Sequence, residues 1–161
     1  PLIDNQFASS GTPFWQIAEL CKQQNLSFDY TCLGIQQAAN HIDLFKIADD
    51  LHVNYVHAHE IHYNNSQHCF AVIDDALNRD QYIYLSICLD VFSQAFAPGV
   101  SAPQSLGLQP WQVTQILRYI IQSKRIVSFD IAELSPPWDQ DGKTAKLAAR
   151  LVFEYVHGLV L

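Results

Sequence analysis

The sequence predicts an α/β fold built on a mostly parallel sheet. Helical and strand-like segments alternate along all 161 residues, the strand-like segments are nearly continuous apolar runs, and loops containing proline follow the last two of them. No internal repeat or low-complexity tract divides the chain. We therefore expect residues 1–161 to form a single α/β domain with about four strands.

Five segments have the apolar periodicity of amphipathic helices. Pro13 and Pro110 stand near the start of two of them, where the missing backbone N–H has no helical partner to lose. Asn40 is a candidate N-cap for a third helix. The predicted helices cover residues 14–24, 41–51, 66–78, 111–123 and 143–157.

Four runs rich in β-branched and aromatic residues lie between these helices and predict strands. The predicted strands cover residues 27–33, 53–59, 82–89 and 125–131. Residues 90–109 and 133–138 form the loops after the last two strands. Because ligands bind just outside the carboxyl ends of parallel strands, we expect the functional site in these two loops.

The composition excludes several classes of protein. Hydrophobic residues make up 49% and charged residues 16%, which argues against disorder, and no apolar run is long enough to cross a membrane. The formal net charge is −7 with no basic stripe, so nucleic acid is not an expected partner. The four cysteines lack CxxC or disulfide-scaffold spacing, and we expect reduced thiols in a cytoplasmic protein.

The chain contains no methionine and begins at Pro1. A protein that starts its own translation begins with methionine, and Pro1 falls in what reads as the middle of a loop. We therefore expect the chain to be part of a longer protein.

Cys88 and Asp90, at the end of the third predicted strand, are the first candidate metal ligands. Residues two apart on a strand point to the same side, and a thiol beside a carboxylate suits a divalent transition metal. Two ligands do not hold a catalytic metal, so others must come from elsewhere. In the alternative interpretation, Cys88 is a small buried apolar residue and Asp90 caps the following turn.

Glu133 follows the fourth predicted strand and lies at the same sheet edge. A carboxylate there can bind a cationic substrate group or take part in proton transfer. The alternative is a solvated loop glutamate.

A second candidate binding segment precedes the first helix, at Ser9-Ser10-Gly11-Thr12-Pro13-Phe14. Hydroxyl groups and free backbone N–H groups before a helix form an anion site, which would suit a substrate carboxylate. The alternative is an ordinary helix cap by Thr12.

Histidines cluster at His57-Ala58-His59-Glu60-Ile61-His62, with His52 and His68 nearby. On a strand, His57 and His59 share a face and form a possible metal pair, although the H-E-x-x-H spacing of zinc proteases is absent. The alternative is a polar strand end, some of whose histidines line a substrate pocket.

Taken together, these segments resemble the ureohydrolase superfamily of arginases, agmatinases and formimidoylglutamases. Three of the superfamily's motifs have counterparts: a strand ending Ser-x-Asp-x-Asp before a Pro-Gly loop, a Glu-x-x-Pro-x-x-Asp loop before a helix starting Thr-Ala, and His-Gly-Thr-Pro-Phe. The counterparts are Ser86-Ile87-Cys88-Leu89-Asp90 with Pro98-Gly99, Glu133-Leu134-Ser135-Pro136-Pro137-Trp138-Asp139 with Thr144-Ala145, and Ser10-Gly11-Thr12-Pro13-Phe14.

The resemblance implies a three-layer α/β/α arginase-like fold, of which this chain is the C-terminal part with about four strands. It implies two Mn²⁺ ions per active site, with Cys88 and Asp90 as ligands and the remaining ligands upstream of this chain. Glu133 would be the catalytic residue facing an amidine or guanidine, and Ser10 and Thr12 would bind the carboxylate of the substrate. Relatives often form closed rings, so a homo-oligomer is also expected.

Three departures from the superfamily pattern refine the resemblance. Cys88 stands where an aspartate is usual, Ser10 stands where a histidine is usual, and the Asp-x-His-x-Asp motif is absent. The first two departures resemble the sequence pattern of the formimidoylglutamase branch. Enzymes of that branch hydrolyse N-formimidoyl-L-glutamate to L-glutamate and formamide in histidine degradation. Because thiolate is softer than Mn²⁺ prefers, the identity of the metal stays open.

Two alternative functions stay open at the level of sequence. One is hydrolysis of another guanidine or amidine, such as arginine, agmatine or guanidinobutyrate. The other is a non-catalytic binding domain on the same scaffold. A nucleotide-binding protein is disfavoured, because no G-x-G-x-x-G or P-loop motif follows a predicted strand.

Overall fold

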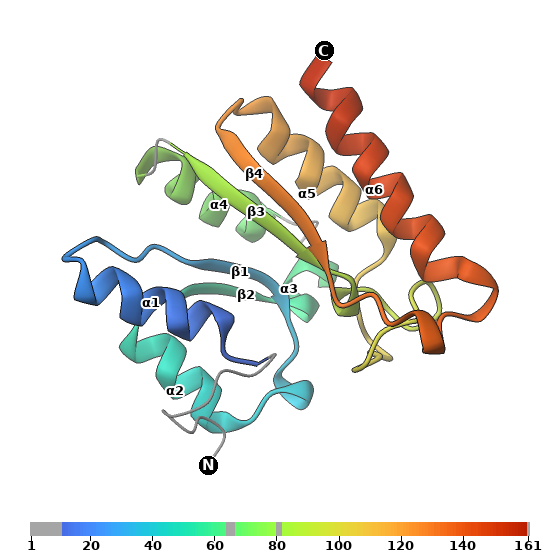
Figure 1. The fold of residues 1–161 in the computed structure, drawn as a ribbon, viewed down its shortest axis with the longest axis horizontal. Coiled ribbons are helices and arrows are strands. Elements are labelled where there is room, and N and C mark those ends of the chain that lie inside the picture. Colours follow the sequence, from blue (N-terminus) through green and yellow to red (C-terminus); the bar gives the residue numbers. More distant parts are fainter. Residues whose placement is uncertain (1–10, 64–66, 80–81, 161) are drawn as a thin grey trace.

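Parallel strands form two separate pairs in the computed structural model, which describes residues 11–63, 67–79 and 82–160 (Figure 1). Strand β1 (Thr31–Ile35) pairs with β2 (Asn54–His57), and β3 (Ile83–Cys88) pairs with β4 (Ile126–Ala132). Both pairs are parallel, as the apolar runs predicted. In Figure 1, β1 and β3 are the inner strands and face each other across the space between the pairs.

Helices connect and flank the strands, which confirms the predicted α/β class. Figure 1 shows α1 and α2 along the β1–β2 pair and α5 packed beside α6 near β4. The helices are α1 (Pro13–Gln23), α2 (Ile42–Asp50), α3 (Ala58–Tyr63), α4 (Gln67–Arg79), α5 (Pro110–Gln122) and α6 (Lys143–Val160).

The proline start signals are confirmed, and the Asn40 cap is wrong. Pro13 and Pro110 begin α1 and α5. The N-cap of α2 is His41, whose Nδ1 accepts a hydrogen bond from the Asp43 backbone N–H at 3.3 Å. Asn40 instead donates from its amide to the Gln36 carbonyl at 2.8 Å, because the short 3₁₀ turn before α2 presents that carbonyl.

Several strand limits differ from the prediction. Strand β1 begins only at Thr31, and β2 ends at His57, where the backbone N–H donates to the Glu60 carboxylate at 2.8 Å and α3 begins. His59 therefore lies on a helix, and the expected strand face shared by His57 and His59 is wrong. The helix α3 was not predicted, because six residues are too few to show a helical period.

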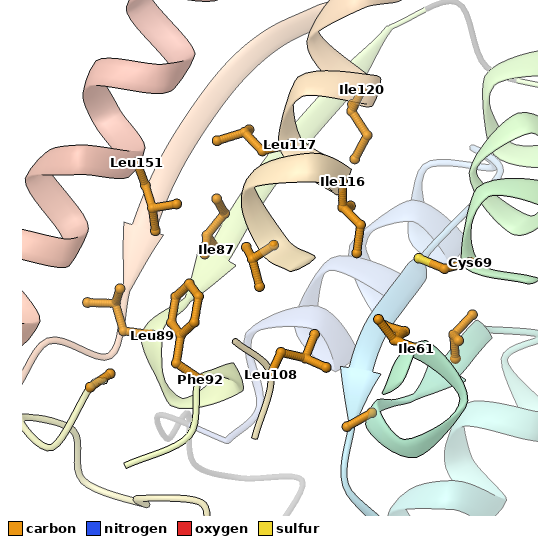
Figure 2. Packing of buried hydrophobic residues seen from close by; sticks show 14 of the residues in the cluster. Ile61, Cys69, Ile87, Leu89, Phe92, Leu108, Ile116, Leu117, Ile120 and Leu151 are labelled. Atoms are coloured by element: carbon orange, nitrogen blue, oxygen red, sulfur yellow. The ribbon is translucent and has the colours of Figure 1, made fainter. Parts of the chain in front are cut away.

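The buried core joins the two strand pairs. Figure 2 shows Ile87, Leu89 and Phe92, from the end of β3 and the turn after it, packed beneath α5 and beside Leu151 of α6. The same cluster extends through Leu108 to Ile61 and Cys69 on α3 and α4. Burial of this continuous apolar surface fixes the carboxyl end of β3, from which the candidate site projects.

Candidate functional site

Cys88 is the last residue of β3, and Asp90 lies in the short 3₁₀ turn Leu89–Val91. The strand-face argument that placed them together is therefore wrong, because the strand ends before Asp90. Cys88 and Asp90 still lie within reach of each other's charge. Burial and then the negative charges of Asp90 and Glu133 together raise the pKa of the Cys88 thiol to about 12.

Glu133 approaches this pair from the loop after β4. Burial and then the charge of Glu133 raise the pKa of the Asp90 carboxyl. Glu133 has a backbone φ of 70°, a left-handed conformation that non-glycine residues seldom adopt, and its Oε2 accepts a hydrogen bond from Ser101 Oγ at 3.2 Å. The structure thus brings together the three residues that the sequence selected.

Two further groups that the sequence analysis missed come from Tyr30, the residue before β1, and from Cys32 on β1. The Tyr30 hydroxyl and the Cys32 thiol are hydrogen-bonded to each other. Burial raises the pKa of both, and the Cys32 thiol also feels the charge of Asp90. No local sequence signal could have found them, because their proximity to Asp90 depends on how β1 and β3 lie relative to each other.

Asp130 on β4 completes the acidic surroundings of Cys88, whose pKa its charge helps to raise. Two hydroxyl groups from β3 hold this carboxylate: Ser86 Oγ donates at 2.6 Å, and the Tyr84 hydroxyl donates to the other oxygen. Because these donors occupy both oxygens, Asp130 supports the neighbouring strand and is a weaker candidate for a ligand than Asp90.

The two loops of the site are tied to each other and to α6. The Gly99 N–H donates to Thr144 Oγ1 at 2.7 Å, and the Ser135 N–H donates to the Gly99 carbonyl at 2.8 Å. Asp139 accepts hydrogen bonds from the backbone N–H groups of Thr144 and Ala145, at 2.8 and 2.9 Å, and so caps α6. A Cβ on Gly99 would lie 2.4 Å from the Asp139 Cβ, which explains the glycine there.

The segment before α1 is described only in part. Thr12 is 3% exposed, and its hydroxyl accepts a hydrogen bond from the Gln16 amide at 2.7 Å. In Figure 1, α1 begins at the end of the molecule where β1 and β2 terminate. Ser10, the other predicted carboxylate-binding residue, lies outside the described residues. Binding of a substrate carboxylate by Thr12 and Ser10 stays a prediction.

The histidine cluster forms no metal pair in this structure. The rings of His57 and His59 stack with centroids 5.2 Å apart, and His57 also contacts Phe45 and Tyr55. His57 Nδ1 is buried without a hydrogen-bond partner. These contacts favour an aromatic packing role at the end of β2.

The donor set of the candidate site fits part of a metal centre. Cys88 and Asp90 are a thiol and a carboxylate in acidic, half-buried surroundings, where a cation would offset the mutual repulsion. Among the described residues, however, no three His, Cys, Asp or Glu side chains are grouped so as to hold a metal ion. If a metal ion were bound here, Cys88 and Asp90 would be two of its ligands, and further ligands would be needed to complete the site.

Comparison with known proteins shows the family of this chain. The model of the arginase family matches residues 3–158. The chain therefore belongs to the arginase family. Formimidoylglutamase of Legionella pneumophila (strain Paris) is 47% identical over 154 residues, covering 96% of this chain and 48% of the relative. Formimidoylglutamase of Clostridium tetani is 49% identical over 148 residues, covering 92% of this chain and 44% of the relative.

Solved structures confirm the arginase-like fold. The crystal structure of formimidoylglutamase from Bacillus subtilis has a TM-score of 0.81 and 23% identity, covering 99% of this chain and 50% of that one. Arginase from Bacillus caldovelox has a TM-score of 0.67 and 21% identity, covering 78% of this chain and 42% of that one. This arginase-family chain thus spans about half the length of the relatives it matches.

The described helices also bear on the prediction about membranes. Within residues 11–63, 67–79 and 82–160, no helix combines the length and apolar character required to cross a lipid bilayer.

Proposed function

We propose that this chain is part of a metal-dependent ureohydrolase that hydrolyses N-formimidoyl-L-glutamate to L-glutamate and formamide. The observation that carries the proposal is the convergence of Cys88 at the end of β3, Asp90 in the turn after it and Glu133 just after β4. It is supported by 47% identity to a protein named formimidoylglutamase over 96% of this chain.

In this proposal Cys88 and Asp90 hold divalent metal, two Mn²⁺ per complete site, together with ligands from the remainder of the family domain. A bound divalent metal lowers the pKa of a coordinated water and so supplies hydroxide near neutral pH. The acidic residues around Cys88 favour a cation in this place, while the thiolate favours a softer metal than an aspartate would.

Glu133 binds and orients the protonated amidine of the substrate. Its carboxylate accepts hydrogen bonds only, which suits the N–H groups of an amidinium, and Ser101 holds one of its oxygens in place. A hydrogen bond to a charged group of this kind contributes about 1.5–3 kcal/mol. Holding the amidine fixes the position of the carbon that is attacked. Thr12 and Ser10 are proposed to bind the glutamate carboxylate.

We place this activity in the cytoplasm, because Cys88 must remain a reduced thiol to bind metal. The proposed partner is the small-molecule substrate, and a homo-oligomer is proposed from the family resemblance alone.

The test reconstitutes a complete domain. The 161-residue chain is co-expressed with the part of L. pneumophila formimidoylglutamase that it does not match, and formamide release is measured with Mn²⁺ present. N-formimidoyl-L-glutamate, L-arginine and agmatine are supplied in parallel. We expect turnover of the first substrate to exceed the others by at least about 10²-fold, because the other substrates lack contacts that the site supplies. Preferential urea release from arginine or agmatine would contradict the proposal.

Glu133→Gln is the decisive variant. We expect turnover to fall by about 10²-fold or more while the metal content stays unchanged, because the amide no longer pairs with the amidinium. Metal content is measured by elemental analysis of the purified protein. Turnover equal to that of the unsubstituted protein would exclude Glu133 from the reaction.

A further inference from the structure

A groove of about 790 Å³ is formed by α5 together with side chains of α4 and α6. Figures 1 and 2 both show α5 between these two helices. The buried α5 residues Ile116 and Leu117 do not line the groove, so it lies on the solvent side of the helix. We call this space the α5 groove. Its volume is within the range of small-molecule sites, which is about 300–1,000 Å³.

Aromatic side chains from α4 and α5 line the α5 groove. The rings of Phe70 and Tyr119 contact each other with centroids 4.7 Å apart, and the Tyr119 hydroxyl donates a hydrogen bond to Asp74 at 2.6 Å. Both rings are therefore held in place. Trp111, in the first turn of α5, adds an indole that is 78% exposed. An exposed indole and two fixed rings in one groove offer apolar contact to a flat ligand ring.

The same groove contains two arginines that share one carboxylate. Arg118 Nε donates to Glu154 Oε2 at 2.8 Å, and Arg150 Nη2 donates to Glu154 Oε1. The Glu154 side chain is 5% exposed, whereas those of Arg118 and Arg150 are 60% and 62% exposed. Arg150 also lies over the Phe153 ring, 5.2 Å from its centroid. These contacts hold both guanidinium groups in place without using all of their N–H donors.

This cluster has a surplus of one positive charge. Among the ion pairs of the described residues, Arg118 and Arg150 pair only with Glu154. The surplus occurs in a chain whose formal net charge is −7. A guanidinium group binds carboxylates through paired N–H donors, so a second carboxylate would find donors that Glu154 leaves free.

We propose that the α5 groove binds one small molecule that carries a carboxylate on an aromatic ring system. The carboxylate pairs with the free N–H groups of Arg118 and Arg150, and the ring packs against the aromatic side chains of the groove. An inorganic anion would leave these rings uncovered, and a neutral aromatic molecule would leave the positive charge unpaired. Cys88, Asp90 and Glu133 do not line the groove, so the proposal is independent of the proposed reaction.

The test measures binding of three probes to the 161-residue chain without metal or substrate. Phenylacetate has both groups, phenylacetamide has the ring without the charge, and acetate has the charge without the ring. We expect phenylacetate to bind at least about tenfold more tightly than either of the others, because it alone makes both kinds of contact. Ligand-observed NMR titration measures the three affinities. Equal affinities for phenylacetate and phenylacetamide would overturn the proposal.

Trp111→Ala and Trp138→Ala form a matched pair that locates the bound ring. Both indoles are largely exposed, at 78% and 67%, but only Trp111 lines the α5 groove. Because both are exposed, neither change should disturb folding, which circular dichroism checks. We expect Trp111→Ala to weaken phenylacetate binding about fivefold or more and Trp138→Ala to leave it unchanged. Equal affinities in the two variants would contradict the groove as the binding site.

Arg150→Gln tests the charge separately from the ring. Glu154 keeps its hydrogen bond from Arg118, so the buried carboxylate stays paired in this variant. With the surplus positive charge removed, we expect phenylacetate to lose its advantage over phenylacetamide, while phenylacetamide binds as before. A retained advantage would show that the carboxylate binds elsewhere in the chain and would overturn the proposal. Because no turnover is measured, failure of the proposed reaction would leave this result intact.

Discussion

Asp90 occupies a position where burial and a neighbouring carboxylate oppose its ionisation. Its pKa is raised first by desolvation and then by the charge of Glu133. A carboxylate in such surroundings is costly unless a cation lies against it. A cation bound beside Asp90 would therefore offset the cost of burying its negative charge next to Glu133.

Replacing Asp90 tests this at the level of one residue. In the reconstituted domain, we expect Asp90→Asn to lose metal and to lower formamide release by about 10²-fold or more, since an amide is a poorer metal ligand than a carboxylate. Asp75→Asn, a matched change on the exposed surface of α4, should leave both unchanged. Full metal content in Asp90→Asn would remove Asp90 from the ligand set.

Cys69 gives a pH prediction away from the candidate site. Burial raises its pKa from 9.0 to about 11 in the folded chain. Between these values the unfolded chain releases the thiol proton while the folded chain keeps it, so folding loses stability as the pH rises from about 9 to about 11. In Cys69→Ala this loss is absent, although the cavity lowers stability at every pH.

The measurement is urea unfolding of both chains at several pH values. We expect the stability advantage of the unsubstituted chain to be constant below pH 9 and to shrink toward pH 11. A constant difference over the whole range would show that Cys69 does not titrate in this way.

At the scale of single residues, the sequence identified Cys88, Asp90 and Glu133 because each follows a strand that is recognisable from its apolar run. It missed Tyr30 and Cys32, although their strand was predicted. Their proximity to Asp90 depends on how β1 and β3 are placed relative to each other, and no local pattern encodes that long-range arrangement.

Among the elements, β1 contains the tightest backbone position. Gly34 has φ +88° inside the strand, and a Cβ there would lie 2.7 Å from Val91 Cγ2 and 3.0 Å from Leu108 Cδ1. Both the left-handed conformation and the lack of space therefore require glycine. The predicted strand stopped at residue 33, before Gly34, because the bulge that extends β1 to Ile35 depends on pairing with β2.

Gly34→Ala should destabilise the chain by about 2–4 kcal/mol, the sum of backbone strain and overpacking. Gly142→Ala is the matched control, since Gly142 has φ +64° but no atom within 4 Å of the added carbon. We expect it to cost only the backbone part, about 1–2 kcal/mol. Urea midpoints measure both, and equal losses would show that Val91 and Leu108 move aside freely.

The limits of helices and strands were predicted well in long segments with a regular apolar period. They were predicted poorly where contacts with other parts of the chain determine where an element begins or ends. Helices α1, α5 and α6 were placed within a few residues. The first two residues of α3, Ala58 and His59, were assigned to a strand and the rest of the helix was not predicted, because its start depends on the Glu60 carboxylate accepting a hydrogen bond from the His57 N–H. A side-chain contact of that kind overrides the weak strand preference of a six-residue segment.

At the scale of the whole molecule, the described residues form two parallel strand pairs that do not pair with each other. The sequence analysis predicted the parallel α/β architecture, and the comparison with solved structures confirms it. The separation of the strand pairs could not be predicted from the sequence, because no local pattern encodes how β1 and β3 lie relative to each other.

We expect the 161-residue chain alone to release no measurable formamide and to bind Mn²⁺ only weakly, since two donors do not hold a catalytic metal. Adding the unmatched part of L. pneumophila formimidoylglutamase should restore both. Calorimetric titration with Mn²⁺ and the formamide assay check the two expectations separately. Tight binding of Mn²⁺ by the isolated chain would show that its own residues complete a site.

The hydrogen bond from the Gly99 N–H to Thr144 Oγ1 anchors the loop that follows Asp90 to α6. Thr144 is 0% exposed and contributes no ligand, yet its hydroxyl anchors a backbone that lies nine residues beyond Asp90. Unwinding the first turn of α6 would therefore remove this hydrogen bond and loosen the loop beside Asp90, where we propose that substrate binds. A change at the start of α6 that spares every acidic and sulfur-bearing side chain would therefore still release that loop.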